Sequence, residues 1–265
     1  MRKVILGLAV LVSLVCAKEL TQEEIKELDK KCQNGDNKVC YNVGRDYIFG
    51  ENGLSKDYQK AKFYFEKGCS AVQSKASGVL SNFLLKWSAD EGSLAACADL
   101  GAMYYDDRYG VKHDYQKALE LFTLACDGGY AEACRGVGHS YYNGNGVSED
   151  LAKAAEYYKK GCDGGYAMAC NNIGVMYDEG EGVSEDPDKA VEYLKKACDG
   201  GKWVGCRNLV SYYLERNKGK AMGYGKKICE LGEKDPDVQN NPEEKEEWRT
   251  ACKAYKTLEG LNNFQ

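Results

Sequence analysis

Cysteine is the residue type in this chain whose number and spacing allow the most chemistry. The 265 residues include 13 cysteines, and several lie eight positions apart, as in Cys126-Asp-Gly-Gly-Tyr-Ala-Glu-Ala-Cys134. Cysteine thiols can form disulfides or bind zinc. The common structural zinc sites use ligand pairs two to four residues apart, so the eight-residue step favours disulfides.

Spacing assigns a partner to every cysteine except Cys16. The other twelve form an even set, which is typical of a disulfide framework in a chain that leaves the cytoplasm. Four of the six pairs share the eight-residue step. The predicted pairs are Cys32–Cys40, Cys69–Cys97, Cys126–Cys134, Cys162–Cys170, Cys198–Cys206 and Cys229–Cys252.

The eight-residue segments recur at a fixed interval and indicate a repeat architecture. Those that begin at Cys126, Cys162 and Cys198 are 36 residues apart, and each starts with Cys-Asp-Gly-Gly. Glycine ends helices in the left-handed conformation, so two antiparallel helices are predicted, with the paired cysteines facing each other across the turn. Because each hairpin packs on its neighbours, the predicted fold is all-α: a solenoid of disulfide-linked helical hairpins.

The helix after each second cysteine carries a fixed set of residues on one face. An apolar residue stands three positions after the cysteine, glycine four and tyrosine seven, offsets that share one side of a helix. Glycine inside a helix costs roughly 0.5–1 kcal/mol relative to alanine. Its recurrence at the same position of successive helices therefore predicts that another helix crosses closely there. The glycines are Gly44, Gly101, Gly138 and Gly174, and the fifth unit has Val210 instead.

A second helix in each unit begins twelve residues before its cysteine. Its N-cap is aspartate or asparagine, both of which cap helices well, and a Lys-Ala pair follows three residues later. We expect the alanine to let the crossing glycine approach and the lysine stem to face solvent. The predicted caps are Asp57, Asp114, Asp150, Asp186 and Asn217.

The first 17 residues have the features of a signal peptide. A basic start is followed by an apolar run at positions 4–15 and a cleavage site at Val15-Cys16-Ala17. The run is too short to span a bilayer comfortably as a helix. We expect cleavage after Ala17, a secreted or periplasmic location, and no transmembrane segment in the mature chain. A lipoprotein acylated at Cys16 is the alternative, which Val15 disfavours because a small residue is usual there.

The remaining residues divide into two caps and a repeat region. In the first cap, Thr21 and Glu24 have the spacing of a capping box. Apolar spacing predicts an extra helix near 76–90, and the last helix is expected to begin near Pro242. The predicted divisions are an N-terminal capping helix (18–35), the solenoid (36–232) with an insertion at about 70–94, and an acidic loop with a C-terminal capping helix (233–265).

Composition limits the partners of the chain. Its apolar content of 43% and charged content of 29% suit a folded protein. With a net charge of −5, it lacks the basic balance of proteins that bind nucleic acid or anionic membrane surfaces. We therefore expect no nucleic-acid partner, and no cofactor is indicated.

The repeat motif resembles that of the Sel1-like repeats, relatives of the tetratricopeptide repeat. The resemblance rests on apolar-Gly-x-x-Tyr, then Gly-x-Gly-Val as in Gly144-Asn-Gly146-Val147, then Asp-x-x-Lys-Ala. The added cysteine pairs resemble those of the secreted Helicobacter cysteine-rich proteins, and the likeness covers nearly all of residues 21–260. It implies a right-handed superhelix in which a disulfide pins each hairpin.

Members of that cysteine-rich family are often labelled β-lactamases, so the resemblance implies weak penicillin binding or hydrolysis as an alternative function. After the leader the chain has no Ser-x-x-Lys, no Ser-Asp-Asn and no Lys-Thr-Gly, the motifs of serine β-lactamases. A zinc enzyme would need several histidines, and the chain has only His113 and His139. All twelve mature cysteines have predicted partners, so none is a candidate nucleophile. We assign no catalytic residues and expect no metal site.

The main hypothesis is a scaffold that binds an extended peptide or protein partner in its concave groove. In the related tetratricopeptide repeats, groove residues lie on the first helix, which here means one, two, five and eight positions after the second cysteine. Asparagine and arginine there can hold a peptide backbone or a C-terminal carboxylate, and a host protein is one source of such a ligand. Ordinary solvated positions are the alternative interpretation. The residues include Tyr41, Asn42, Arg45, Arg135, His139, Tyr142, Asn171, Asn172, Asp178, Arg207 and Asn208.

Overall fold

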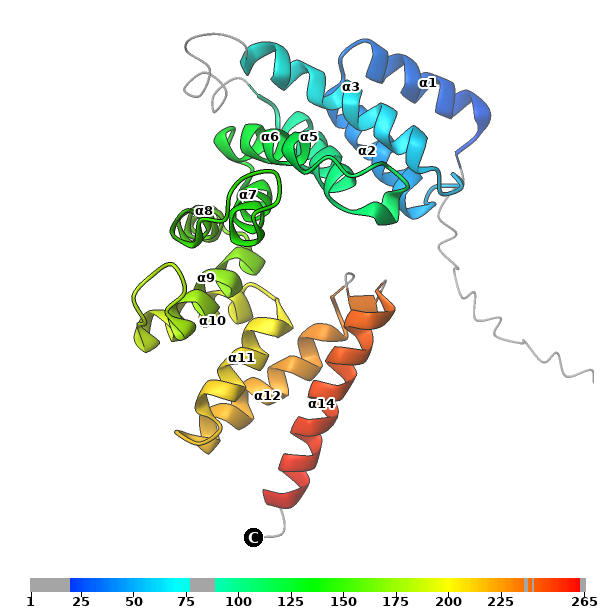
Figure 1. Ribbon diagram of the computed structural model, residues 1–265. Coiled ribbons are helices and arrows are strands. Elements are labelled where there is room, and N and C mark those ends of the chain that lie inside the picture. The colour runs from blue at the N-terminus through cyan, green and yellow to red at the C-terminus, as the bar shows by residue number, and fades with distance from the viewer. Residues whose placement is uncertain (1–19, 77–88, 236–237, 240, 263–265) are drawn as a thin grey trace, which may run out of the picture.

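The computed structural model of the protein describes residues 20–76, 89–235, 238–239 and 241–262. Within these ranges all regular secondary structure is helical, and the helices stack into a curved solenoid that is open on one side (Figure 1). The signal peptide predicted at 1–17 lies outside the described residues. None of the described helices combines the length and the apolar character needed to cross a bilayer.

The stack alternates two kinds of helix between its two caps. We call the helix with the second cysteine of each of the first five pairs the A helix and the helix that follows it the B helix. The A helices are α2 (Asn37–Phe49), α5 (Glu91–Tyr105), α7 (Ala131–Asn143), α9 (Ala167–Glu179) and α11 (Trp203–Tyr213). The B helices are α3 (Tyr58–Ala76), α6 (Tyr115–Asp127), α8 (Leu151–Asp163), α10 (Pro187–Asp199) and α12 (Lys218–Gly232). The caps are α1 (Gln22–Gln33) and α14 (Pro242–Asn262), and a short 3-10 turn, η1 (Asp107–Tyr109), follows α5.

Side-chain caps begin the B helices where they are predicted. In all five, the side chain of the cap residue accepts a hydrogen bond of 2.9–3.0 Å from the backbone N–H three residues later. Pro187 occupies the first turn of α10, where it loses no hydrogen bond. Thr21 and Glu24 form the predicted capping box at the start of α1. These contacts satisfy N–H groups that have no partner within the helix.

Each of the six predicted disulfides is present, and each joins one unit of the stack to the next. The second glycine of Asp-Gly-Gly takes a left-handed backbone, as Gly165 does with a φ of 91°, and the chain reverses direction there. This reversal places the Cα atoms of Cys162 and Cys170 4.5 Å apart. All six Cα–Cα distances lie between 4.5 and 5.0 Å, which is within the usual range for a disulfide.

The hydrophobic core runs as a band between the A and B helices. Val137, Ile173 and Leu209, each three residues after a second cysteine, are at most 1% exposed. The cystines and the alanines of the Lys-Ala pairs fill much of the remaining space. The predicted apolar face of the A helix is therefore the face that the B helix covers.

The A-helix glycine lets the B helix of the same repeat pack closely. A Cβ placed on Gly138 would lie 2.6 Å from Tyr158 Cδ1, and one on Gly174 would lie 2.9 Å from Leu194 Cγ. The alanine of the Lys-Ala pair is buried beside this crossing, in agreement with the expectation that a small residue there lets the glycine approach. The side chain at the crossing belongs to the residue four positions after that alanine, because alanine is too small to fill the space. Ala154 contributes only its carbonyl oxygen, 3.2 Å from the Gly138 Cβ position.

The lysine of each Lys-Ala pair keeps contact with water and also covers an aromatic ring. Lys153 Nζ lies 5.2 Å from the centre of the Tyr141 ring, and Lys189 Nζ lies 5.1 Å from that of Tyr177. The same contact recurs in all five repeats. A cation–π contact at an exposed site is worth roughly 0.5–1 kcal/mol, so the pattern adds a modest link between the helices of each repeat.

The insertion predicted at about 70–94 is partly absorbed by the flanking helices. Helix α3 continues to Ala76, seven residues beyond Cys69, and α5 begins at Glu91. Both ends of the insertion therefore extend repeat helices, because their apolar residues continue the buried faces: Val72 and Leu94 are 0% and 6% exposed. The extra helix predicted near 76–90 falls mostly on residues 77–88, which lie outside the described residues.

The segment between α12 and α14 contains buried residues. Asp235 and Val238 are 7% and 0% exposed, although the segment is predicted as an acidic loop. Lys202, at the start of α11, places its Nζ 3.1 Å from Asp235 Oδ2. The loop is therefore anchored to the last repeat before α14 begins at Pro242, where the sequence predicts a helix start.

Candidate functional site

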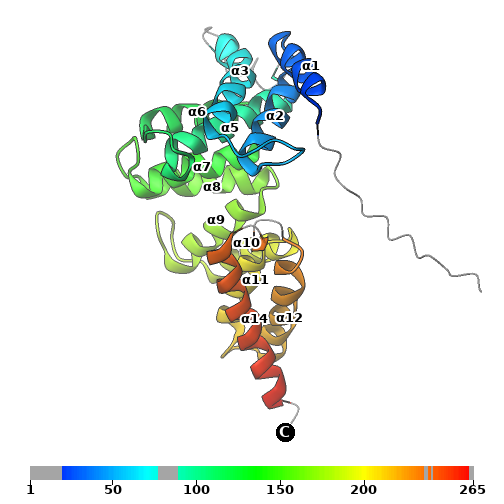
Figure 2. The same ribbon diagram turned by 90° about the vertical axis from the view of Figure 1, so that its right-hand side faces the viewer.

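The A helices form the inner layer of the curve. Successive A helices contact one another from α2 to α11, whereas α3, α6 and α8 lie on the outer side (Figure 1). All eleven predicted groove residues lie on A helices. Because their offsets differ from those that face the B helix, they share the opposite surface, which we call the inner face. In Figure 2, which looks onto the open side, α14 passes in front of α11 and α12.

Charged side chains from neighbouring repeats meet at the N-terminal end of the inner face. The Arg45 guanidinium, on α2, lies 6.0 Å from the centre of the Tyr41 ring. Asp99, on α5, is half-buried. Burial and the nearby charge of Glu132 raise the pKa of its carboxyl to about 7, while Arg45 opposes the rise. Near neutral pH, Asp99 is therefore partly protonated and can donate a hydrogen bond as well as accept one.

Two tyrosine hydroxyls hold Glu132. Tyr166 donates to Glu132 Oε1 at 3.0 Å, and Tyr130 donates to Oε2 at 3.4 Å. Burial raises the pKa of Tyr130 well above its usual value, so this phenol remains a donor at neutral pH. These residues line a hollow of about 460 Å³ beside the turns that precede α7 and α9.

Tyr105, at the end of α5, connects the second and third repeats. Its hydroxyl is 2.9 Å from His139 Nδ1, and Asn145 Nδ2 donates to the same hydroxyl at 2.6 Å. Burial and the positive charge of Arg135 lower the pKa of His139, so its imidazole is neutral at pH 7. Arg135 Nε is buried and has no acceptor among the described residues. This Nε is shielded from solvent, although the Arg135 side chain as a whole is partly exposed on the inner face.

Asparagines of neighbouring A helices interact directly. Asn208 Nδ2, on α11, donates to Asn171 Oδ1, on α9, at 2.9 Å. Asn172 is hydrogen-bonded to the Tyr158 hydroxyl, whose pKa burial raises to about 12. Each amide has two donor hydrogens and an acceptor oxygen. Asn171 is only 7% exposed and holds Asn208 in place, whereas Asn172 and Asn208 are partly exposed and keep hydrogen-bonding capacity for a ligand.

Asn42 and Asp178 are predicted groove residues that are exposed. Their role in a groove stays a prediction. Tyr142, in contrast, donates through its hydroxyl to Glu181 Oε2 at 2.7 Å, which ties α7 to the loop after α9. The inner face is therefore most connected between α7 and α11.

Sequence reasoning missed several residues of the inner face. Asp99 and Tyr105 stand two and eight positions after Cys97, so the repeat register contained the signal for both. Glu247 pairs with Arg207, with 3.5 Å between Oε2 and Nη1. Because Glu247 comes from the capping helix, the repeat pattern holds no signal for it.

The inner face presents amide, guanidinium and phenol groups. The twelve described cysteines are all in disulfides, so none supplies a thiolate. In the part of the chain that the structure describes, no group of three His, Cys, Asp or Glu side chains is placed to hold a metal ion. Directional hydrogen bonding is the chemistry that this surface offers.

The repeats match a known family. Residues 38–71, 94–130, 131–166, 167–202 and 205–233 match the Sel1 repeat family. Each matched segment covers one A helix and one B helix. The five matches together cover more than half of the chain.

Individual proteins are similar over part or most of the chain. Cytochrome c oxidase assembly factor 7 of Homo sapiens is 32% identical over 125 residues, which are 46% of this chain and 47% of that protein. The chain thus spans about half the length of the curated relatives that it matches. A solved Sel1 repeat protein from Oxalobacter formigenes is 19% identical, with 87% of this chain and 94% of that chain covered and a TM-score of 0.60; it shows the shared fold. Helicobacter pylori cysteine rich protein B is 27% identical, with 57% and 93% covered and a TM-score of 0.38.

Proposed function

The chain belongs to the Sel1 repeat family, whose repeats mediate protein interactions, and from this we propose that it binds an extended segment of a partner protein along its inner face. The observation that carries the proposal is the row formed by Arg135, Asn172, Asn171 and Asn208. These residues come from three successive A helices, and two of them are joined by a hydrogen bond of 2.9 Å.

The row matches the chemistry of an extended backbone. An extended chain presents N–H and C=O groups at a rise of about 3.3 Å per residue, and side-chain amides can pair with both groups. The positive charge of the partly exposed Arg135 side chain favours an incoming carbonyl or carboxylate. A hydrogen bond to a charged group contributes roughly 1.5–3 kcal/mol, enough to position one point of a peptide.

A phage-displayed peptide library, selected on the oxidised full-length protein, tests the proposal. Selected peptides should bind Arg135→Ala and Asn172→Ala at least ten-fold more weakly than the native protein. Lys153→Ala, on the outer B helix α8, is the control and should bind normally. Equal binding to the native protein and both inner-face variants would overturn the proposal.

Six disulfides indicate a compartment outside the cytoplasm, where cystines persist. The proposed partner is therefore encountered after export, and we propose that the leader is removed after Ala17. The intact mass of protein recovered from the periplasm or medium checks this step. A mature chain that begins at Lys18 is expected, and retention of residues 1–17, or a lipid on Cys16, would contradict it.

The hydrolytic alternative that the family resemblance implies has less support. His139 is engaged by the Tyr105 hydroxyl at 2.9 Å, and the described cysteines are all in disulfides. A chromogenic cephalosporin assay decides the question. Turnover that follows the protein through purification would establish hydrolysis, whereas the recognition proposal expects none.

A further inference from the structure

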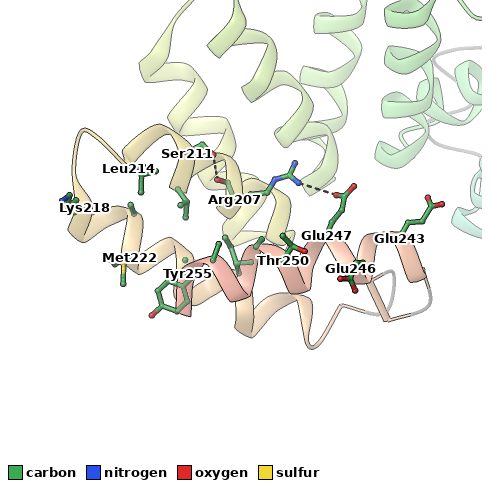
Figure 3. Close-up of a pocket in the computed structure, with 16 residues that line it drawn as sticks. Arg207, Ser211, Leu214, Lys218, Met222, Glu243, Glu246, Glu247, Thr250 and Tyr255 are labelled. Carbon is green, nitrogen blue, oxygen red and sulfur yellow. Dashed lines mark hydrogen bonds and ion pairs between the residues drawn. The ribbon is translucent and has the colours of Figure 1, made fainter. Parts of the chain in front are cut away.

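The last junction of the stack contains a mainly apolar cavity of about 790 Å³. It lies between α11, α12 and α14, away from the asparagine row, and its lining includes Val210, Leu214, Met222 and Ile228 (Figure 3). Leu214 is 43% exposed, so the cavity opens to solvent at this side. A space of this size and polarity is ordinarily filled by a ligand or by another part of a protein.

The sequence of the fifth repeat explains why the space is there. In the earlier repeats a large B-helix side chain packs on the A-helix glycine, as Tyr158 packs on Gly138. The fifth repeat reverses these sizes: Val210 stands at the glycine position, and Gly225 stands where Tyr158 stands in its repeat. A Cβ on Gly225 would meet the Tyr255 ring from α14. The capping helix thus covers Gly225 but leaves the neighbouring volume open.

The capping helix is also displaced from the place of a regular A helix. Successive A helices contact one another elsewhere in the stack, whereas α14 packs mainly on α12. Trp248 Nε1 on α14 donates to Ile228 O on α12 at 2.9 Å, and the disulfide between these helices spans 23 residues instead of eight. Between α11 and α14, the Arg207–Glu247 ion pair of 3.5 Å crosses one end of the opening (Figure 3).

The lining residues of each helix recur at helical spacing. On α11 they are Arg207, Val210 and Ser211, and Leu214 follows at the C-cap of this helix; together they have the i, i+3, i+4, i+7 pattern of one helix face. The lining residues of α12 and α14 follow the same three- and four-residue steps. Three helix faces around a common space make three sides of a four-helix arrangement, and an amphipathic helix is the shape that completes it.

The two ends of this cavity carry opposite charges. Glu243, Glu246 and Glu247 line the end formed by the first turns of α14, and Lys218 lies at the far end (Figure 3). At the acidic end, Arg207 on the opposite wall pairs with Glu247, and Arg249 pairs with Glu246 at 3.8 Å, so the three carboxylates exceed these two guanidinium groups by one negative charge. A helix with basic residues beside one end of its apolar stripe complements this surface.

We propose that this cavity is a second protein-binding site, which takes an amphipathic partner helix whose apolar face ends in basic residues. The site is separate from the inner-face row of the proposed function and shares only Arg207 with the predicted groove. Its apolar walls provide affinity, and its acidic end sets the orientation of the helix.

Three synthetic 16-residue peptides test the shape and the charge of the site. The first has leucines at i, i+3, i+4 and i+7 with lysines beside one end, the second has glutamates in place of the lysines, and the third is the first with a central proline. Fluorescence anisotropy with the oxidised full-length protein should show that the lysine peptide binds at least ten-fold more tightly than the other two. Equal binding of the proline peptide would overturn the proposal, because that peptide cannot form the helix.

Matched variants of the protein show where the lysine peptide binds. Leu214→Lys should weaken the lysine peptide at least ten-fold, whereas Phe63→Lys should not, since Phe63 is a 47% exposed apolar residue on α3. Glu243→Lys with Glu246→Lys should reverse the preference toward the glutamate peptide. Native-like binding by Leu214→Lys, in a variant whose circular dichroism and six disulfides are unchanged, would overturn the site. Asn172→Ala should bind the lysine peptide normally, which separates this test from that of the inner face.

Discussion

The carboxyl of Asp99 shows how strongly the stack alters a single side chain. An aspartate in water ionises near pH 4, yet burial and the charge of Glu132 raise the pKa of Asp99 to about 7. Burial and the charge of Arg135 lower the pKa of His139, so near neutral pH this histidine is largely uncharged and Asp99, on the same face, is partly protonated. The inner face therefore presents more neutral hydrogen-bonding groups than its formal charges suggest.

The raised pKa of Asp99 makes stability depend on pH. Because the folded pKa lies above the unfolded value, the native state favours the protonated form, and this contribution is complete below about pH 4 and lost as the pH rises to about 7. We expect Asp99→Asn to be more stable than the native protein by roughly 1–3 kcal/mol at pH 8 and equal to it near pH 4. Urea denaturation at both pH values measures the difference. Asp178→Asn, an exposed change on the same face, should show no such dependence, and identical native and Asp99→Asn curves at pH 8 would contradict the expectation.

At the scale of helices, the contact between A-helix glycine and B-helix side chain sets how closely each hairpin packs. The crossing holds a tyrosine ring against Gly138 and a leucine against Gly174. A larger residue at the glycine position pushes the helices apart, whereas the fifth repeat avoids the clash by placing Gly225 on the B helix. The same pair of positions thus accounts for close packing in four repeats and for a cavity in the fifth.

Two glycine-to-alanine changes distinguish the effect of close helix packing on stability from the effect of helix propensity. Gly138→Ala brings a methyl group 2.6 Å from the Tyr158 ring and is expected to destabilise the fold by roughly 1–3 kcal/mol. Gly223→Ala, on α12, has no neighbouring atom within 4 Å and should stabilise by roughly 0.5–1 kcal/mol because alanine favours helix. Thermal denaturation of both variants compares the effects. A stabilised Gly138→Ala protein would refute the close crossing.

Removal of a disulfide should cost more stability when the loop that it closes is longer, because the loop entropy rises with the logarithm of loop length. Cys162 and Cys170 are eight residues apart, and Cys69 and Cys97 are 28 apart. Chain entropy then assigns roughly 2–3 kcal/mol to the first pair and roughly 3–4 kcal/mol to the second. Double Cys→Ser variants are compared by urea denaturation, and the variant that lacks Cys69–Cys97 should unfold at the lower urea concentration. A larger loss for the short loop would indicate that the entropic argument fails here.

At the scale of the whole molecule, the stack depends on its ends as much as on its repeats. Each repeat packs only on its neighbours, so a terminal repeat exposes an apolar face unless a cap covers it. Helix α1 covers the first repeat, and α14 covers part of the last, where Trp248 packs on Gly232. The partial cover at the C-terminal end leaves the cavity, so one feature of the overall architecture creates the proposed second site.

Deletion of residues 233–265 should therefore expose the apolar face of α12. With Cys229→Ser included to avoid a free thiol, the shortened protein is expected to self-associate, because Ile228 and Leu231 lose their cover. Size-exclusion chromatography with light scattering measures this change. The full-length Cys229→Ser/Cys252→Ser variant is the control and should keep the solution mass of the native protein. A shortened protein that also keeps the native state of association would show that α14 is not needed as a cap.

Sequence alone determined the features that depend on near neighbours or on period. The capping bonds join residues three apart, the Asp-Gly-Gly turns bring together cysteines eight apart, and the 36-residue interval implies stacked hairpins. Helix starts and the four eight-residue cysteine pairs follow from this local geometry, whereas Cys69–Cys97 and Cys229–Cys252 were predicted as the same kind of pair lengthened by insertions. The repeat register also predicted which positions share the inner face, and the same register, applied to the second repeat, would have added Asp99 and Tyr105.

Only the tertiary structure decided the properties that arise between distant segments. The pKa of Asp99 depends on Glu132 from the next repeat, and the 790 Å³ cavity depends on where Tyr255 meets Gly225. The anchoring of Asp235 by Lys202 likewise joins residues 33 apart. Electrostatic and packing energies follow distances in space, and for residues on different helices those distances are set by the fold and not by separation along the chain.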